Sequence, residues 1–393
     1  MAYKQRDEIS VSQLNDMQVY LGEETIEDYQ GGQMSRRRML RRLILICGSA
    51  AGATALLVAC GDATATISSV TTAPAATTSA ATSAAATTAA ATTTAAATTV
   101  AGTTVAPTTS AATSAAGTTA ASTTAAPTTS AATTAAGGTS ASGTTAAAAA
   151  TPGQAKGPLT VAATDPAVQA SDVTYQGDTT IMGYLAKPAA AGTYPGVIVI
   201  HENRGLTDHI KDVARRFARA GFIALAPDLA SRNGGTNKVP TDQVTGYFAN
   251  AKPEDLVKDL TSSGTYLETV AGVKAGKYGV VGFCFGGGMA LRFAAANPKV
   301  AAAVPYYGPV PTPVSLMATT QAAILGQYGG TDARVNGGIP SLEKTLKDAG
   351  KTYEKKIYDG AGHAFNNDTG ASYNETAAVA AWGETLTWLK KYL

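Results

Sequence analysis

The stretch Tyr278–Ala296, which reads YGVVGFCFGGGMALRFAAA, places a cysteine between a strand pattern and a helix pattern. Its first six residues are apolar, aromatic or glycine, which is typical of a buried strand, and its last nine favour a helix. Gly282 and Gly286 flank Cys284, and glycine permits the sharp turn that such a junction requires. The pattern predicts a nucleophile elbow with Cys284 beside a helix N-terminus, whose partial positive charge favours a thiolate. The alternative is a structural cysteine in a glycine-rich turn.

Around this stretch, strand and helix patterns alternate from residue 158 to the end of the chain. Continuous apolar runs predict further strands at 196–200, 222–226, 300–306, 322–328 and 353–358. Apolar residues at helical spacing predict helices at 208–220, 253–270, 342–349 and 377–393. Such alternation is typical of an α/β domain, in which helices cover both faces of a mostly parallel sheet. The region of roughly 235 residues is long enough for one such domain.

A nucleophile at an elbow requires an acid and a histidine, which follow it along the chain in that order. His363 is the only histidine after Cys284, and it lies in a loop after a predicted strand. The acid has three candidates, Asp332, Asp348 and Asp359. Asp332 follows a strand in a Gly-Gly-Thr-Asp turn, whereas Asp348 lies on a charged helix face and Asp359 is too close to the histidine. We therefore expect Asp332 to orient His363 and to stabilise its cation. A surface histidine is the alternative for His363.

Several motifs of this region resemble those of the dienelactone hydrolase family. They are GFCFGGG around Cys284, YGGTD ending at Asp332, GAGHAF around His363, and the stretches VIVIHENRGL and APDL. The resemblance covers about residues 172–393 and implies an α/β-hydrolase fold. It also implies a hydrolase that cleaves a small ester or lactone through a Cys-Asp-His triad, without metal or organic cofactor.

The resemblance assigns further roles near the nucleophile. In the family, a glutamate just after the first core strand assists activation of the thiol, and Glu202 matches it. Two backbone N–H groups form the family's oxyanion hole, which here would be those of Phe285 and Asn203.

Substrate recognition departs from the family pattern. Dienelactone hydrolases hold the substrate carboxylate with two arginines, and Arg232 matches the first. Asn367 stands where the second is expected, and an amide supplies no charge. We therefore expect a neutral or larger ester or lactone as substrate. Arg204 could compensate, or could be a solvated surface residue.

The N-terminal part resembles an export signal. The basic stretch SRRRMLRR at 35–42 resembles a twin-arginine signal and precedes an apolar run, Leu43–Ala59. The run ends in Leu-Val-Ala-Cys, which resembles a bacterial lipobox with Cys60 as the lipidated residue. An uncleaved membrane anchor is the alternative. Both predict a domain tethered to the outer face of the cytoplasmic membrane. Residues 1–34 are polar, without clear apolar periodicity, and favour a disordered extension.

Composition divides the chain into three parts. Residues 1–60 hold the polar extension and the signal, and 61–157 form a tether of Ala, Thr, Ser, Gly and Pro that cannot build a core. Residues 158–393 form the catalytic domain, where Cys284 is the only cysteine, so an internal disulfide is impossible. The net charge of +2 gives no indication of nucleic-acid binding, and no metal-ligand spacing occurs. We expect a monomer.

Two other function classes compete with an enzyme. A hydrolase fold without activity could serve as a tethered binding module, and the Ala/Thr/Ser-rich tether could itself be a structural stalk. A complete set of Cys284, Asp332 and His363 favours the enzyme, because a fold that has lost activity has no need to keep all three.

Overall fold

The computed structural model describes residues 11–61 and 157–393. Both ranges belong to one compact unit of the chain, while the second unit, Thr71–Ala148, lies outside the described residues. The tether predicted at 61–157 therefore falls almost entirely outside them.

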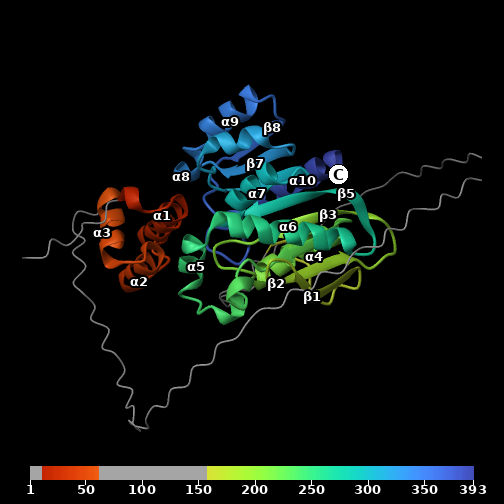
Figure 1. Cartoon of the computed structure of the whole chain (residues 1–393), viewed down its shortest axis with the longest axis horizontal. Helices are drawn as coiled ribbons and strands as arrows, with labels where there is room; N and C mark the ends of the chain where they lie inside the picture. The colour runs from red at the N-terminus through yellow and green to blue at the C-terminus, as the bar shows by residue number, and fades with distance from the viewer. Residues whose placement is uncertain (1–10, 62–156) are drawn as a thin grey trace, which may run out of the picture. The chain divides into compact units, whose positions relative to one another are not determined.

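One eight-stranded sheet forms the centre of the domain (Figure 1). The strands lie in the order β1-β2-β4-β3-β5-β6-β7-β8. The pairs β1/β2 and β2/β4 are antiparallel and every other neighbouring pair is parallel, which confirms the predicted mostly parallel sheet. The strands are Val168–Gln176 (β1), Thr180–Pro188 (β2), Tyr194–Ile200 (β3), Ile223–Pro227 (β4), Val273–Phe283 (β5), Val300–Tyr306 (β6), Ala323–Gly329 (β7) and Tyr353–Tyr358 (β8).

Helices connect the parallel strands. They are Asp208–Arg219 (α4), Val244–Asn250 (α5), Pro253–Thr269 (α6), Phe285–Ala296 (α7), Ala333–Asn336 (α8), Ile339–Asp348 (α9) and Glu375–Tyr392 (α10). The predicted strands and helices agree with these bounds to within a few residues. The hairpin β1/β2 and the short helices α5 and α8 are additions to the predicted elements.

The order of the strands determines where a ligand can bind. From β3 the chain passes through α4 to β4 on one side, and then through α6 to β5 on the other side of β3. Because parallel crossovers are right-handed, this reversal places α4 and α6 on opposite faces of the sheet. The helix α7 packs against α6, and α10 contacts α4 through the rings of Trp382 and Phe217. The reversal creates a switch point beyond the carboxyl ends of β3 and β5, where ligands bind in open α/β sheets.

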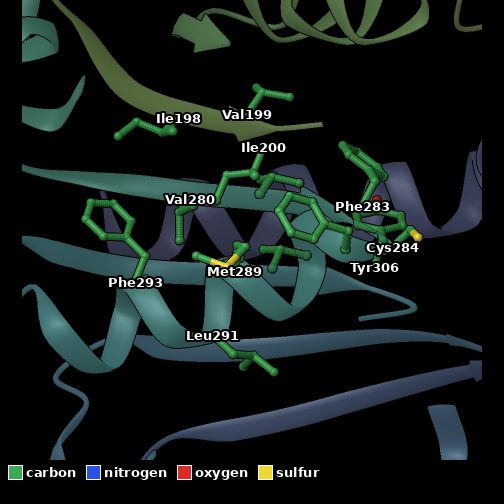
Figure 2. Close-up of a cluster of buried hydrophobic side chains, with 14 of the residues drawn as sticks. Ile198, Val199, Ile200, Val280, Phe283, Cys284, Met289, Leu291, Phe293 and Tyr306 are labelled. Carbon is green, nitrogen blue, oxygen red and sulfur yellow. The ribbon is translucent and has the colours of Figure 1, made fainter. Parts of the chain in front are cut away.

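A buried cluster between the sheet and α7 fixes the end of β5 (Figure 2). Ile198 and Ile200 of β3, Val280 of β5, and Met289 and Phe293 of α7 are all fully buried. Burial of a side chain of this size contributes about 1.5–3 kcal/mol. The nucleophile candidate lies at one end of the cluster, so the core that stabilises the domain also positions the thiol.

Residues 11–61 contain three helices, Asp16–Gln30 (α1), Arg36–Cys47 (α2) and Ala50–Ala59 (α3). The expectation that residues 1–34 are disordered is therefore wrong for the described part. Asn15 and Gln18 form a capping box at the start of α1, a signal that its polar composition obscured. The face that α1 buries is formed by a small set of residues: Met17, Tyr20, Leu21 and Ile26.

The apolar run Leu43–Ala59 does not form one straight helix. Gly48 adopts a left-handed conformation with φ of 71° and ends α2 within the run. Within residues 11–61 and 157–393, no single helix is long and apolar enough to cross a membrane. The helices α2 and α3 reach that length and composition only together, with a bend of 110° between them.

Candidate active site

Cys284 lies at the junction of β5 and α7, at the switch point. Its backbone has φ of 54° and ψ of −120°, a strained conformation that is rare for a residue with a side chain. A Cβ at Gly286 would collide with the backbone of Ile200 and His201, so glycine is required for the close approach of α7 to β3. The predicted sharp turn is present, and strain of this kind is typical of catalytic elbows.

The imidazole of His363 is held by Asp332. The Nδ1 of His363 lies 2.7 Å from Oδ2 of Asp332, and Asp332 follows β7 while His363 lies in the loop after β8. Burial by itself would raise the pKa of Asp332, but the hydrogen bond and the charge of the imidazole lower that pKa overall. Burial likewise opposes protonation of His363, yet the hydrogen bond to Asp332 and nearby carboxylates raise its pKa. The pair therefore stabilises an imidazolium.

The second ring nitrogen of the histidine is available for chemistry. His363 Nε2 is buried and has no hydrogen-bond partner among the described residues. A ring nitrogen of His363 and Cys284 Sγ belong to a group of ligand-type atoms that lie within 4.8 Å of one another. The third member is a carboxylate oxygen of Glu24 from α1. A thiolate, an imidazole and a carboxylate are ligand types of zinc, although a structural site would need a fourth ligand.

Glu202 follows β3 at the carboxyl end of the sheet, near enough to Cys284 for its charge to act on the thiol. Its Oε2 accepts a hydrogen bond of 2.8 Å from Nδ2 of Asn367, and its Oε1 is buried with no partner among the described residues. Asn367, the residue that stands in place of the family's second arginine, is therefore engaged with Glu202. An amide suits this position because it can donate to a carboxylate without carrying a charge.

The surroundings of the sulfur oppose ionisation of the thiol. Burial, followed by the negative charges of Glu24 and Glu202, raises the pKa of Cys284 well above its ordinary value. The hydroxyl of Tyr20 and the backbone N–H of Phe285 lower the pKa, but by less. The expected stabilisation of a thiolate by the helix N-terminus is therefore outweighed, because a fully buried sulfur next to carboxylates loses the solvation that a charge needs.

A small cavity joins these residues. It has a volume of about 160 Å³ and is lined by residues from the ends of β3 and β5, the loop after β8, and α1. These lining residues include Glu24, Glu202, Asn203, Arg204, Cys284, His363 and Asn367. The predicted nucleophile, histidine and glutamate thus meet at one cavity at the carboxyl end of the sheet.

The family model described as "Dienelactone hydrolase family" matches residues 181–393. The chain belongs to this family. The domain has the α/β-hydrolase fold, and the helices α1, α2 and α3 lie outside the matched range.

The match to this chain covers most of the length of the relatives. A protein of Methylorubrum extorquens named "Putative carboxymethylenebutenolidase" is 33% identical over 227 residues, which is 55% of this chain and 78% of the relative. A protein of Bradyrhizobium sp named "Probable 2-oxo-3-(5-oxofuran-2-ylidene)propanoate lactonase" is 34% identical over 224 residues, or 54% of this chain and 90% of the relative. The solved structure of a "Putative Dienelactone Hydrolase from Klebsiella pneumoniae" is 30% identical with a TM-score of 0.54, covering 57% of this chain and all of that one. The chain is accordingly a dienelactone hydrolase-like hydrolase.

Arg232 is not among the residues that line the cavity. Its Nε and Nη2 donate to the buried carboxylate of Asp259 at 2.9 and 2.8 Å. The guanidinium of Arg232, which the family pattern assigns to the substrate carboxylate, is thus engaged in a bidentate ion pair with Asp259. Arg204, by contrast, does line the cavity. The structure therefore does not bring Arg232 together with the nucleophile, and the only arginine of the described residues at this cavity is Arg204.

The oxyanion-hole candidates come from two elements next to the cavity. Phe285 begins α7 and its backbone N–H faces the sulfur, whereas Asn203 follows Glu202 at the end of β3. The side chain of Asn203 donates to Oε1 of Glu24 at 2.9 Å. A carboxylate from α1 is thus bound beside the place where the family's oxyanion would develop.

Two residues of α1 contact the thiol, and sequence reasoning missed both. The hydroxyl of Tyr20 donates to Cys284 Sγ at 3.6 Å, and the thiol lies 3.4 and 3.6 Å from the two oxygens of Glu24. Their i, i+4 spacing places Tyr20 and Glu24 on one face of a helix. Nothing local in the sequence indicates what that face contacts, because the contact joins residues about 260 positions apart.

Asp368 anchors the loop that carries His363, and it also was not predicted. Its Oδ2 accepts from Arg216 at 2.6 Å and from Thr160 at 3.0 Å, and its Oδ1 lies 3.1 Å from Nδ1 of His209. Asp368, Arg216 and His209 are buried, and Arg216 and His209 belong to α4. The loop from His363 to Asp368 is thus held at both ends by a carboxylate–histidine contact.

Proposed function

We propose that this hydrolase cleaves a carboxylic ester or lactone, with Cys284 as nucleophile, His363 as base and acid, and Asp332 as the group that orients the histidine. The observation that supports this most is the pairing of His363 Nδ1 with Asp332, which leaves Nε2 as the ring nitrogen for the thiol. A bound Asp and a free Nε2 next to a nucleophile are the requirements of a triad.

The proposed reaction begins from the neutral thiol. As Sγ bonds to the carbonyl carbon, the thiol proton passes to Nε2 of His363, and the carbonyl oxygen takes the negative charge. The backbone N–H groups of Phe285 and Asn203 stabilise that oxyanion. When the intermediate collapses, the carbon–oxygen bond to the alcohol breaks and the alkoxide takes the proton from His363, which leaves a thioester.

Deacylation reverses the roles. His363 removes a proton from water, the hydroxide attacks the thioester carbonyl, and the carbon–sulfur bond breaks. The sulfur recovers a proton, and the carboxylic acid leaves. Glu202 assists as a second proton acceptor, since its Oε1 lacks a partner among the described residues. No step requires a metal or an organic cofactor.

The proposed substrate is a small-molecule ester or lactone that is neutral or is larger than dienelactone. The family arginine Arg232 is engaged with Asp259, and Asn367 is engaged with Glu202. Arg204 remains as a cation at the cavity. The names of the relatives, a carboxymethylenebutenolidase and a lactonase, favour a lactone among the substrates to test.

Replacement of Cys284 by alanine tests the proposal. In the full chain we expect the variant to lose hydrolysis of a chromogenic short-chain ester and of a lactone, with product analysis as the readout. The domain should stay folded, since glycines and not the cysteine permit the turn. The matched control is Cys47→Ala, which removes the other buried cysteine and should leave activity unchanged. Hydrolysis by Cys284→Ala at the wild-type rate would contradict the mechanism and favour a binding module.

The same proposal includes a location. The twin-arginine-like stretch and the Leu-Val-Ala-Cys motif support export followed by lipidation of Cys60, which would tether the domain to the outer face of the membrane. Cys60 is exposed at the end of α3. We expect the mature chain to begin at Cys60 and to partition into detergent, and Cys60→Ser to abolish both. Recovery of an intact N-terminus from membranes would indicate an anchor instead.

A further inference from the structure

Residues of α1 line the same cavity as Cys284 and His363. The helix α1 belongs to the same compact unit as the hydrolase domain, although it lies outside the family match. It contacts α5, and its residues Tyr20 and Glu24 reach Cys284. Cys284 is only 2% exposed in this arrangement, so an ester carbonyl has little access to the sulfur while α1 stays in place.

We infer that the rim of the catalytic pocket is a docking surface for α1, and that Glu24 occupies the position of the acid product and closes the active site. This inference rests on the proposed function, because it identifies Glu24 as an internal product analogue. The reaction releases a carboxylic acid next to the sulfur, and Glu24 presents a carboxylate 3.4 Å from that sulfur. Asn203, beside the proposed oxyanion hole, donates to the same carboxylate.

The docking is specific and involves charges on both sides. Arg334, two residues after Asp332, donates to Glu27 at 3.0 Å and stacks over the ring of Tyr20 with its guanidinium carbon 4.3 Å from the ring centroid. Tyr20 is 7% exposed and its ring also meets that of His363 edge to face. A cation that contacts both a carboxylate and an aromatic face holds α1 in one register over the pocket.

A second set of contacts joins the N-terminal segment to α5. Asn15 donates to the carbonyl of Ala249 at 3.2 Å, and Gln18 donates to the side chain of Asn250 at 3.0 Å. The amide of Asn250 donates in turn to the carbonyls of Leu45 and Ile46 in α2. Hydrogen bonds to α5 therefore add to the contacts with Arg334, and the N-terminal segment is fixed at two places.

The chemistry around the sulfur favours a closed site of low activity over a catalytic role for Glu24. Two carboxylates, Glu24 and Glu202, face one thiol, and negative charge near the sulfur opposes the thiolate that must form during attack. Removal of Glu24 would leave Glu202 and His363 in place. It would also free Asn203 and open the cavity to substrate.

Proteolytic removal of the N-terminal segment would release α1 from the active site. Cleavage before Cys60, which is part of the proposed location, would separate α1, α2 and α3 from the domain. A folded precursor would then remain closed until export and open when the segment is removed. A twin-arginine route is compatible with this order, because it carries proteins that are already folded.

Alkylation of the full chain tests the inference without relying on hydrolysis. Iodoacetamide labelling of each cysteine is followed over time by peptide mass spectrometry in wild type, Glu24→Ala and Glu23→Ala. Loss of a hydrogen bond to a charged group shifts an equilibrium by roughly tenfold or more. We therefore expect Cys284 of Glu24→Ala to react about tenfold faster, with kcat/KM for a neutral ester rising in parallel. Exposed Cys60 is the internal reference in wild type and Glu24→Ala, where it should react at an unchanged rate; the charge of Glu23 raises the pKa of Cys60, so rates in Glu23→Ala are compared directly with wild type.

Glu23→Ala is the matched control because it removes one carboxylate from the same helix without a contact to the sulfur. An equal rise in both variants would show that any loosening of α1 suffices, and would overturn the role of Glu24. Faster alkylation without hydrolysis in any form would support the docking and contradict the proposed function. Slower hydrolysis in Glu24→Ala with unchanged alkylation would make Glu24 part of the catalytic machinery and overturn the inference.

Discussion

The domain contains two histidine–aspartate contacts of similar length in different surroundings. His363 and Asp332 lie 2.7 Å apart at the cavity, with the histidine side chain 17% exposed. His209 and Asp368 lie 3.1 Å apart below α4, with side chains 3% and 0% exposed. Each histidine has an Nε2 without a hydrogen-bond partner among the described residues.

The difference lies in what else meets each pair. Asp368 is shared with Arg216, whose guanidinium satisfies its charge, and the part of the chain that the structure describes gives the second nitrogen of His209 no hydrogen-bond partner. Among the described residues, His363 is the ion-pair partner of Asp332, and a ring nitrogen of His363 lies within 4.8 Å of Cys284 Sγ. A histidine–aspartate pair therefore does not by itself identify a catalytic site. We expect the group next to the second nitrogen and the charge balance of the aspartate to distinguish the two pairs.

The largest expected effect separates the two histidines. His363→Ala should lower kcat/KM by about 10³–10⁴, because both acylation and deacylation transfer protons through this ring. Its thermal midpoint should change little, since the side chain is partly exposed. His209→Ala should show the reverse pattern, with activity retained per folded molecule and a lower midpoint. Paired kinetics and thermal unfolding on both variants check this, and equal loss of activity in the two would break the distinction.

The next effect concerns Asp332, the proposed acid of the triad. Asp332→Asn should reduce kcat/KM by orders of magnitude, though less than loss of the histidine, because an amide keeps the side chain's shape but cannot stabilise the imidazolium. The pKa of His363, which Asp332 helps to raise, should fall in this variant. A titration of the imidazole by NMR measures that shift. An unchanged histidine pKa would mean that other carboxylates dominate its charge.

The buried aspartate should affect stability. Asp368→Asn leaves Arg216 with Asp212 as its remaining carboxylate, so the free energy of unfolding should fall by less than the roughly 3–5 kcal/mol that an uncompensated buried charge costs. Burial opposes ionisation of Asp368, but His209 and Arg216 lower its pKa well below the ordinary value. Because its pKa is lower in the folded state, Asp368 stabilises the protein at pH values above its unfolded-state pKa of about 3.9. This stabilisation is lost progressively as the pH falls below that value. Urea unfolding at pH 7 and near pH 3 should therefore show the gap between wild type and Asp368→Asn narrowing in acid.

The smallest expected effect concerns Asn367, which lies between His363 and Asp368 in the loop after β8. Because its amide carries no charge and donates to Glu202, we expect less than about a hundredfold preference in kcat/KM for a carboxylated lactone over its neutral analogue, or roughly 2.7 kcal/mol. A larger preference would show that Arg204 rebuilds the missing clamp. Arg204→Gln would then remove it.

The central site could be predicted from sequence because its signals are local. Gly282 and Gly286 mark the turn around Cys284, and His363 and Asp332 each follow a recognisable strand. The alternation of apolar runs also predicted the six parallel strands, although the hairpin β1/β2 escaped. Arg232 was assigned by position in a motif, and a motif cannot reveal that Asp259 approaches from α6.

The sequence by itself determined the fold class, the elbow and the identities of the nucleophile, acid and histidine candidates, because each depends on residues within a few positions of one another. Tertiary structure alone decided which polar groups meet. It joined Asn367 to Glu202, assigned Asp368 to Arg216, and brought Glu24 from α1 to Cys284. These pairings depend on strand order and helix packing, and the favourable electrostatics of each exist only after those long-range contacts form.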